Sequence, residues 1–208
     1  GVMRGREFLM KDSYSFDINE DAAKISYYKM FLAYVKTFQR MGLKAIPVSA
    51  ESGPIGGNLS HEFSVIAPTG ESEIFCDKNI LNLDINKKKL TTDQEISEAV
   101  EDYLKFYSAT DEKHDVNDFN KTVKQSDQLT GRGIEVGHIF SFGDKYSKPM
   151  KASIVNPDGK SSDVYMGSYG IGVSRLVATI IECFNDDKGI IWPISVAPFK
   201  VNIINLKN

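Results

Sequence analysis

The glycine-rich stretch from Met166 to Arg175 (MGSYGIGVSR) constrains the fold of this chain more than any other, because it joins a predicted strand to a predicted helix. The strand that begins at Asp163 is expected to end at these glycines, which have no Cβ and let another backbone or a ligand approach closely. Apolar residues then recur at helical spacing from Ile171 to Ile181 and predict a helix with one buried face. Arg175 lies in its second turn, where the side chain can point back over the glycines. The stretch therefore predicts either a packing junction with a surface arginine or the floor of a ligand-binding cleft.

The order of these glycines, Gly-x-x-Gly-x-Gly, excludes two common nucleotide-binding motifs. It is not the dinucleotide-binding fingerprint, and a Walker loop would need Gly-Lys followed by Ser or Thr. If the stretch binds a nucleotide, it does so in another way.

Composition and charge limit the class of protein. With 208 residues, of which 41% are hydrophobic, the chain can form one good-sized core or two small ones. Its net charge of −3 excludes a generally basic nucleic-acid-binding protein, so any RNA contact has to be local.

Cys76 and Cys183 are too few for a disulfide framework and lack metal-ligand spacing, which fits a reducing, cytoplasmic compartment. No apolar run approaches the ~20 residues that span a bilayer, so no membrane contact is expected. The chain begins within a pattern and without an initiator methionine, and we expect it to be a fragment of a longer protein.

The first third of the chain predicts a strand followed by a long helix. Residues 4–16 alternate apolar and polar side chains, which predicts a strand whose buried face carries Phe8, Met10, Tyr14 and Phe16. An edge strand with a solvated arginine pair is the alternative. A helix is predicted from about residue 20 to 41, with Asn19 or Asp17 as its cap, Gly42 after its end and an aromatic and methionine stripe in the core.

Three shorter segments follow. Residues 44–50 predict a strand near a sheet edge because of Pro47, and residues 63–67 and 73–77 predict a hairpin around the turn at 68–70. Between them, residues 51–59 contain three glycines and a proline, so neither a helix nor a sheet ladder is expected. This segment is either a simple connection or a mobile lid over a small ligand.

The second half returns to strands after a polar middle segment. Residues 93–107 predict a helix within the segment 78–130, where no catalytic cluster is evident and His114 is expected to be solvated. Strands are predicted at 134–140, at 151–155 and 162–166 around the turn at 156–159, and at 199–206. Together these elements predict an α+β fold, an antiparallel sheet flanked by helices.

Four motifs in this order resemble the bacterial prolyl-tRNA synthetases, which are class II aminoacyl-tRNA synthetases. They are Met3 to Phe16, Ser60-His61-Glu62-Phe63, Gly133 to Phe140, and Gly167 to Arg175, supported by Ile191-Trp192-Pro193 and Ala197-Pro198-Phe199. The resemblance implies a partial class II catalytic core that activates L-proline with ATP and Mg²⁺ to prolyl-adenylate and transfers it to tRNA(Pro). It also implies a homodimer for the full-length enzyme.

The resemblance assigns an ATP site to one group of residues. It implies that Arg175 holds the γ-phosphate, that Arg4 reaches the outer phosphates and that Phe8 lies against the adenine. Arginine suits this task because its charge is permanent and its donors form a planar fork. Glu135 is implied as a catalytic residue and Mg²⁺ ligand, and Gly170 and Gly172 as the floor of the ATP site.

A second group is implied to bind proline, namely Met10, Asp12, His61, Glu62, His138 and Ser168. The methionine would contact the pyrrolidine ring and Asp12 would face the imino nitrogen. Ser168 departs from the cysteine of many relatives, so thiol-specific behaviour does not transfer. The alternative for the third motif is that Glu135 pairs with Arg132 or Lys145 and that His138 is a satisfied sheet residue.

The lid is implied to comprise Ser52, Gly53, Gly56 and Gly57, in a loop from 52 to 59 that closes over prolyl-adenylate and excludes water. Its flanks would carry Glu51 and Glu71.

The resemblance also divides the chain. Residues 1–77 and 131–198 are expected to form the catalytic core, and 199–208 to begin the connection to an anticodon-binding domain. Residues 78–130 occupy the place of an editing domain but are too few to form one. A proline pocket rejects alanine poorly, so a separate trans-acting deacylase is expected. The fragment itself is expected to be inactive. The alternatives are a truncated synthetase-like binding or regulatory module and an unrelated α+β scaffold.

Overall fold

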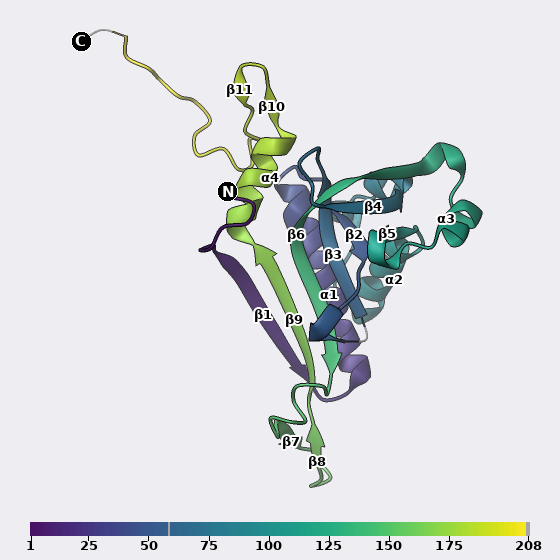
Figure 1. The fold of residues 1–208 in the computed structure, drawn as a ribbon. Coiled ribbons are helices and arrows are strands. Elements are labelled where there is room, and N and C mark those ends of the chain that lie inside the picture. Colours follow the sequence, from purple (N-terminus) through teal and green to yellow (C-terminus); the bar gives the residue numbers. More distant parts are fainter. Residues whose placement is uncertain (58, 207–208) are drawn as a thin grey trace.

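The computed structural model describes residues 1–57 and 59–206, and a seven-stranded sheet runs through it (Figure 1). The strands lie in the order β1-β9-β6-β3-β2-β5-β4 and pair antiparallel except β2 with β5. Their bounds are β1 (Met10–Asp17), β2 (Ile46–Ser49), β3 (Leu59–Ile66), β4 (Ser72–Asp77), β5 (Ser108–Thr110), β6 (Gln128–Gly143) and β9 (Tyr165–Gly172). With helices packed against this sheet, the predicted α+β class is confirmed. Asn58, Lys207 and Asn208, which fall in the predicted lid and C-terminal connection, lie outside the described residues.

The long helix α1 (Glu20–Arg40) covers one face of the sheet, as predicted. Asn19 caps it, because its Oδ1 accepts a hydrogen bond of 2.8 Å from the Ala22 amide. Gly42 follows its end at φ 81°, a left-handed conformation that glycine adopts without strain. The aromatic residues of the predicted stripe, Tyr27, Phe31, Tyr34 and Phe38, are buried in the core as predicted. Its methionines, Met30 and Met41, are only partly buried against the core.

The long strand β6 pairs with three other strands of the sheet. Its first half pairs with β4, and its second half pairs with β3 on one side and β9 on the other. The predicted hairpin between β3 and β4 is therefore wrong: Ile66 and Ser72 lie opposite the same residue, Gly133, in two different ladders. The connection crosses over β6 at Gly70, where a Cβ would lie 2.5 Å from the Arg132 carbonyl carbon. A hairpin turn and a crossover look alike in sequence because both favour glycine.

The glycine-rich stretch continues the strand instead of ending it. β9 runs through Gly167 and Gly170 to Gly172 because β1 and β6 pair with it on both sides. The predicted helix follows at once as α4 (Val173–Cys183) and buries Leu176 and Ile180.

The apolar face of β1 is exposed, contrary to prediction. Phe8 precedes the strand, and Tyr14 and Phe16 are each more than half exposed. The opposite face packs toward α1 with polar side chains: Lys11 Nζ donates to Tyr34 Oη at 2.9 Å, and Ser15 Oγ lies 2.9 Å from Tyr169 Oη. The alternation of apolar and polar residues predicted the strand correctly, but it did not predict which face of the strand packs against the core.

Pro47 lies within the sheet and not at its edge, since β2 sits between β3 and β5. Its missing N–H is tolerated because the ladder with β5 consists of the single pair Ser49 and Ala109. The Pro47 carbonyl is also used, accepting a hydrogen bond of 2.7 Å from Ser108 Oγ.

The middle segment is tied to the core. Its helix α2 (Asp93–Leu104) packs against α1, and β5 joins the main sheet. Shorter elements connect these: η2 (Lys78–Asn82), η3 (Ile85–Lys87), η4 (Asp111–Lys113), α3 (Val116–Thr122) and η5 (Gln125–Asp127). His114 is not solvated as expected, because its ring stacks on Phe75 at 3.7 Å and its Nδ1 lies 2.9 Å from Tyr107 Oη.

Two small hairpins lie outside the main sheet. The pair β7 (Ser153–Val155) and β8 (Ser161–Asp163) turns at residues 156–159 as predicted, with the Gly159 amide donating to the Asn156 carbonyl. The pair β10 (Asn185–Asp186) and β11 (Gly189–Ile190) follows α4. Figure 1 shows the first hairpin extending from the end of the sheet opposite α4.

The predicted strand at 199–206 is wrong. These residues have no regular secondary structure, are exposed, and extend away from the sheet (Figure 1). A strand forms only where a neighbouring strand takes up its backbone hydrogen bonds, and the described residues supply none here. No helix in the described ranges is both long and apolar enough to cross a bilayer.

Candidate active site

A cleft of about 470 Å³ lies beside the strands β1, β6 and β9 and the start of α4. It brings together residues from three of the four motifs found in the sequence. The lining residues include Arg4, Phe8, Met10, Asp12, Glu135, His138, Phe140, Ser168, Gly170, Gly172 and Arg175. Residues that are far apart in sequence thus share one cavity.

Strand register explains this convergence. Asp12 of β1 and His138 of β6 both lie opposite Gly170 of β9, one on each side. Side chains on neighbouring strands at the same level point to the same face of a sheet. Gly170 has no side chain, so the space between Asp12 and His138 stays open. A Cβ at this position would lie only 3.1 Å from Met10 Cε.

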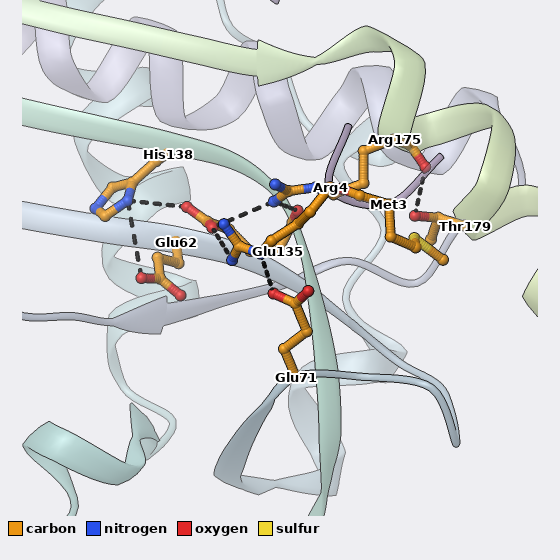
Figure 2. A network of polar contacts seen from close by, with 8 residues as sticks. All are labelled: Met3, Arg4, Glu62, Glu71, Glu135, His138, Arg175 and Thr179. Carbon is orange, nitrogen blue, oxygen red and sulfur yellow. Dashed lines mark hydrogen bonds and ion pairs between the residues drawn. The ribbon is translucent and has the colours of Figure 1, made fainter. Parts of the chain in front are cut away.

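Arg175 reaches from α4 to the backbone and side chain of Glu135. Its Nη1 donates to the Glu135 carbonyl at 2.7 Å and lies 3.3 Å from Oε2 of the same residue, while its Nε donates to the Met3 carbonyl at 3.0 Å. Thr179, one turn later, donates to the Arg175 carbonyl at 2.9 Å. The guanidinium is thereby held in the cleft by the N-terminal segment and β6 (Figure 2).

Arg4 approaches the same carboxylate from the N-terminal segment. Its Nη2 lies 4.0 Å from Glu135 Oε2, and its Nε pairs with Glu71 (Figure 2). Two permanent positive charges therefore meet at one end of the cleft, with Glu135 between them. Such a pair of arginines suits a polyanionic ligand.

His138 is oriented by contacts to both ring nitrogens. Nδ1 lies 3.1 Å from Glu135 Oε1, and Nε2 lies 2.7 Å from Ser60 Oγ. The ring also stacks on Phe140 at 3.8 Å. Glu62 stands on the same side, with Oε1 3.8 Å from His138 Nδ1. The alternative pairing of Glu135 with Arg132 or Lys145 is not observed, because Glu135 contacts Arg175, Arg4 and His138.

The carboxyl groups of Glu135 and Glu62 have pKa values that are shifted in opposite directions. Burial tends to raise the pKa of Glu135, but the hydrogen bond from His138 and the charges of His138, Arg175 and Arg4 outweigh it and lower the pKa below its usual value. Burial, followed by the negative charge of Glu135, raises the pKa of Glu62 to about 7. Near neutral pH, Glu135 is ionised, whereas Glu62 is a mixture of the protonated and the ionised carboxyl group.

Glu62→Gln is expected to change how stability depends on pH. The pKa of Glu62 in the folded state is about 7, above its ordinary value of 4.5. Its stabilising contribution is therefore complete below pH 4.5 and is lost as the pH rises through about 7. At pH 8 the buried carboxylate destabilises the fold by roughly 2 kcal/mol, which glutamine avoids.

Denaturant unfolding of the 208-residue chain at pH 5 and pH 8 measures this effect. The variant should gain stability relative to wild type only at the higher pH. Glu73→Gln, on the exposed side of β4, serves as the matched control. An equal difference between variant and wild type at both pH values would contradict the assignment.

His61 lies elsewhere than expected. It is buried on the α1 face of β3, where its Nδ1 and Tyr27 Oη are 2.6 Å apart and its ring meets Phe31 edge-on. Burial, with a smaller effect from His138, lowers the pKa of His61 to about 4. Successive residues of a strand point to opposite faces, so Ser60 and Glu62 face the cleft side and His61 does not.

The loop with the predicted lid residues Ser52, Gly53, Gly56 and Gly57 does not line the cleft. It contains a single 3-10 turn, η1 (Gly53–Ile55), although no helix was expected. It lies against the end of β6, since a Cβ on Gly57 would be 2.5 Å from the Ser141 carbonyl oxygen.

Sequence reasoning missed two polar partners of the cleft. Ser60 precedes Glu62 by two residues, and strand alternation places both on one face, a signal that was available. Glu71 was expected at the flank of the lid, and its pairing with Arg4 follows from the crossover at Gly70, which the sequence does not reveal.

The residues that could hold a divalent cation are Glu62, Glu135 and His138. Each offers one ligand atom, and these atoms lie within 4.8 Å of one another. Mg²⁺ prefers oxygen ligands and binds through one or two carboxylates together with substrate phosphates. The two glutamates beside an arginine-lined cleft fit this chemistry.

Comparison with known proteins agrees with the geometry of the cleft. Residues 1–184 match the family model "tRNA synthetase class II core domain (G, H, P, S and T)". Curated relatives named proline–tRNA ligase include one from Rhodopseudomonas palustris (strain HaA2), 55% identical over 207 residues, and one from Chelativorans sp. (strain BNC1), 57% identical over 209 residues. Each alignment covers 100% of this chain and 47% of the relative, so the chain spans about half the length of these proteins. The chain thus belongs to the family of the class II tRNA synthetase core domain.

Proposed function

We propose that the protein containing this chain is a proline–tRNA ligase, which activates L-proline with ATP to prolyl-adenylate and transfers the prolyl group to tRNA(Pro). The observation that carries the proposal is the convergence of Arg175, Arg4, Glu135 and His138 in one cleft. The relatives named proline–tRNA ligase support the choice of amino acid.

The arginine end of the cleft is proposed to bind ATP. Arg175 and Arg4 bring charge to the phosphates, and Phe8, which lines the same cavity, offers an aromatic face to the adenine. Stacking of this kind contributes ~1–3 kcal/mol per base and does not depend on base identity. Gly170 and Gly172 leave the floor open for the ligand.

Magnesium is proposed to bind at Glu135, with Glu62 as a further carboxylate. Bound there with the phosphates, the cation would neutralise charge that develops during transfer. Glu135 is suited to this role because its lowered pKa keeps it ionised. The protein's own contribution is to hold Arg175 and His138 in fixed orientations around this carboxylate.

The other end of the cleft is proposed to bind proline. Met10 supplies apolar contact, and Asp12, Ser168 and His138 supply polar groups. In the proposed reaction the proline carboxylate attacks the α-phosphate of ATP and pyrophosphate leaves, so the enzyme acts by positioning and charge neutralisation.

We also propose an oligomeric state and a separate editing partner for the full-length enzyme. The full-length enzyme is proposed to be a homodimer, and correction of alanine errors is proposed to fall to a separate deacylase. Support for the second comes from residues 78–130, where α2 buries Ile96, Ala99, Val100 and Tyr103 and β5 joins the main sheet. The segment forms part of the core and leaves little chain for a hydrolytic domain.

Proline-dependent exchange of pyrophosphate into ATP by the complete gene product tests the proposal. We expect exchange with proline well above that with glycine, histidine, serine or threonine, and none after heat inactivation. Faster exchange with another amino acid, or none with any, would overturn it. The same assay on the 208-residue chain tests the expectation that this chain alone is inactive and separates an enzyme from a binding module.

A further inference from the structure

The ring of His138 is held on three sides by residues of β3 and β6. Nδ1 lies 3.1 Å from Glu135 Oε1 (Figure 2), Nε2 lies 2.7 Å from Ser60 Oγ, and the ring stacks on Phe140 at 3.8 Å. Ser60 lies opposite Phe140 in the ladder of β3 with β6, so the ring that stacks on Phe140 meets the serine of the neighbouring strand. Three contacts of different kinds therefore fix the orientation of one ring.

The contact with Glu135 determines where His138 carries a proton. Glu135 Oε2 lies 3.3 Å from Arg175 Nη1 and 4.0 Å from Arg4 Nη2, and two arginines keep this carboxylate ionised. An ionised carboxylate only accepts hydrogen bonds, so Nδ1 of His138 is the donor and carries a hydrogen. The hydrogen bond at one ring nitrogen sets the role of the other, which leaves Nε2 for Ser60.

The hydroxyl of Ser60 suits Nε2 whether His138 is neutral or charged. It can donate to Nε2 of the neutral ring, and it can accept from Nε2–H of the imidazolium. Ser60 is only 8% exposed, so water has little access to replace this hydrogen bond. His138 lines the cleft whereas Ser60 does not. Ser60 therefore acts on a ligand only through the ring of His138.

The neighbour of His138 on β9 does not hold the ring. In the ladder of β6 with β9, His138 lies opposite Gly170, which has no side chain. Gly170 forms the floor of the cleft between His138 and Asp12. A histidine ring that loses its hydrogen bond to Ser60 meets no side chain of Gly170 that would keep it off this floor.

We propose that Ser60 is a positioning residue: its hydroxyl fixes Nε2 of His138 while Nδ1–H is directed at Glu135, and the ring is thereby held at the wall of the cleft. The effect on proline binding rests on the proposed function, whereas the orientation of the ring does not. When the ring turns over Gly170, fewer molecules have an open cleft. The apparent affinity for proline then weakens by that fraction while the chemical step is unchanged.

Nuclear magnetic resonance of the histidine ring nitrogens tests the orientation without measuring activity. In the complete gene product with isotope-labelled histidine, the signals of His138 are those that disappear in His138→Gln. Nδ1 should carry a hydrogen in the wild type, and Ser60→Ala should shift the Nε2 signal because this nitrogen loses its partner. The signals of His114, whose Nδ1 lies 2.9 Å from Tyr107 Oη outside the cleft, should not move. An Nδ1 without a hydrogen in the wild type, or an Nε2 signal that Ser60→Ala leaves in place, would overturn the proposal.

Two further substitutions separate the hydroxyl of Ser60 from the volume of its side chain. Threonine and valine have the same shape, but only threonine has a hydroxyl. Both are frequent in strands, so neither is expected to disturb β3. Ser60→Thr should keep the Nε2 signal near its wild-type position, and Ser60→Val should shift it as Ser60→Ala does. Equal shifts in the two variants would show that packing, and not the hydroxyl, orients the ring.

Proline-dependent pyrophosphate exchange by the complete gene product measures the effect on the site. Ser60→Ala should raise the KM for proline roughly five-fold, the change expected from the loss of one hydrogen bond, and leave kcat and the KM for ATP nearly unchanged. Ser60→Thr should recover most of this loss. Ser97→Ala on α2 is the matched control, since its hydroxyl also donates a hydrogen bond, of 2.9 Å to the Asp93 carbonyl, but outside the cleft.

The two measurements together decide the role of Ser60. A shifted Nε2 signal with an unchanged KM for proline would reduce Ser60 to a structural contact and overturn its positioning role. If the wild type shows no proline-dependent exchange, the proposed function fails, while the ring signals still decide how His138 is held.

Discussion

In the complete gene product, Arg175→Ala is expected to lower kcat/KM for the proposed ATP-dependent proline activation by roughly 10²- to 10³-fold, the effect of removing one preorganised donor from a charge-stabilising site. The guanidinium is held in place by the carbonyls of Met3 and Glu135 before any ligand binds. It therefore needs little reorganisation when negative charge arrives. Alanine removes the charge and also leaves Glu135 without the closer of its two arginines.

The fold is expected to survive this change. The buried residues of α4 are Leu176, Thr179 and Ile180, and Arg175 is not among them. Arg175→Lys should recover only part of the activity, because lysine restores the charge but not the planar fork. Arg40→Ala, at the exposed end of α1, is the control and should be fully active. Circular dichroism and thermal melting accompany the kinetics, and loss of folding in Arg175→Ala would show that its role is structural.

Phe31→Ala is expected to destabilise the chain by about 3–5 kcal/mol, the range for truncating a fully buried aromatic ring. Phe31 has no exposed surface and joins three elements, since its ring meets His61 at 5.3 Å, Phe63 at 5.6 Å and Tyr103 at 5.9 Å. Its removal leaves a cavity between α1, β3 and α2.

Guanidinium unfolding of the 208-residue chain measures this loss, with an unchanged slope against denaturant expected if the unfolded state is the same. Phe16→Ala is the matched control, because Phe16 is 60% exposed on β1 and should change stability by no more than about 0.5 kcal/mol. A loss below about 1 kcal/mol for Phe31→Ala would mean that the core closes over the gap.

The residues of the candidate site were assigned through the resemblance of their motifs, and strand alternation explains only part of their arrangement. Met10 and Asp12 are two residues apart on β1 and so share a face, whereas Glu135 and His138 are three apart and would point to opposite faces of a regular strand. The register shift in the ladder of β3 with β6 adds one residue between them and brings their side chains together. The pairing of β1, β9 and β6 places both pairs beside one cleft. His61 was misplaced because it was carried along with its motif although it alternates with Glu62.

The sequence by itself determined the local elements. The cap at Asn19, the left-handed Gly42 and the turn before Gly159 each depend on residues within a few positions of one another. The periodicity of α1 likewise places its aromatic residues on one face without reference to the rest of the chain.

Only the tertiary structure decided which strands pair and which faces are buried. The crossover at Gly70 sends β4 to the far side of β6, and the apolar face of β1 turns away from the core because α1 packs against the other face. Residues 199–206 have strand-like alternation but join no strand ladder in the described part of the chain. Backbone hydrogen bonds of a strand are made to residues distant in sequence, so local pattern cannot choose among possible partners.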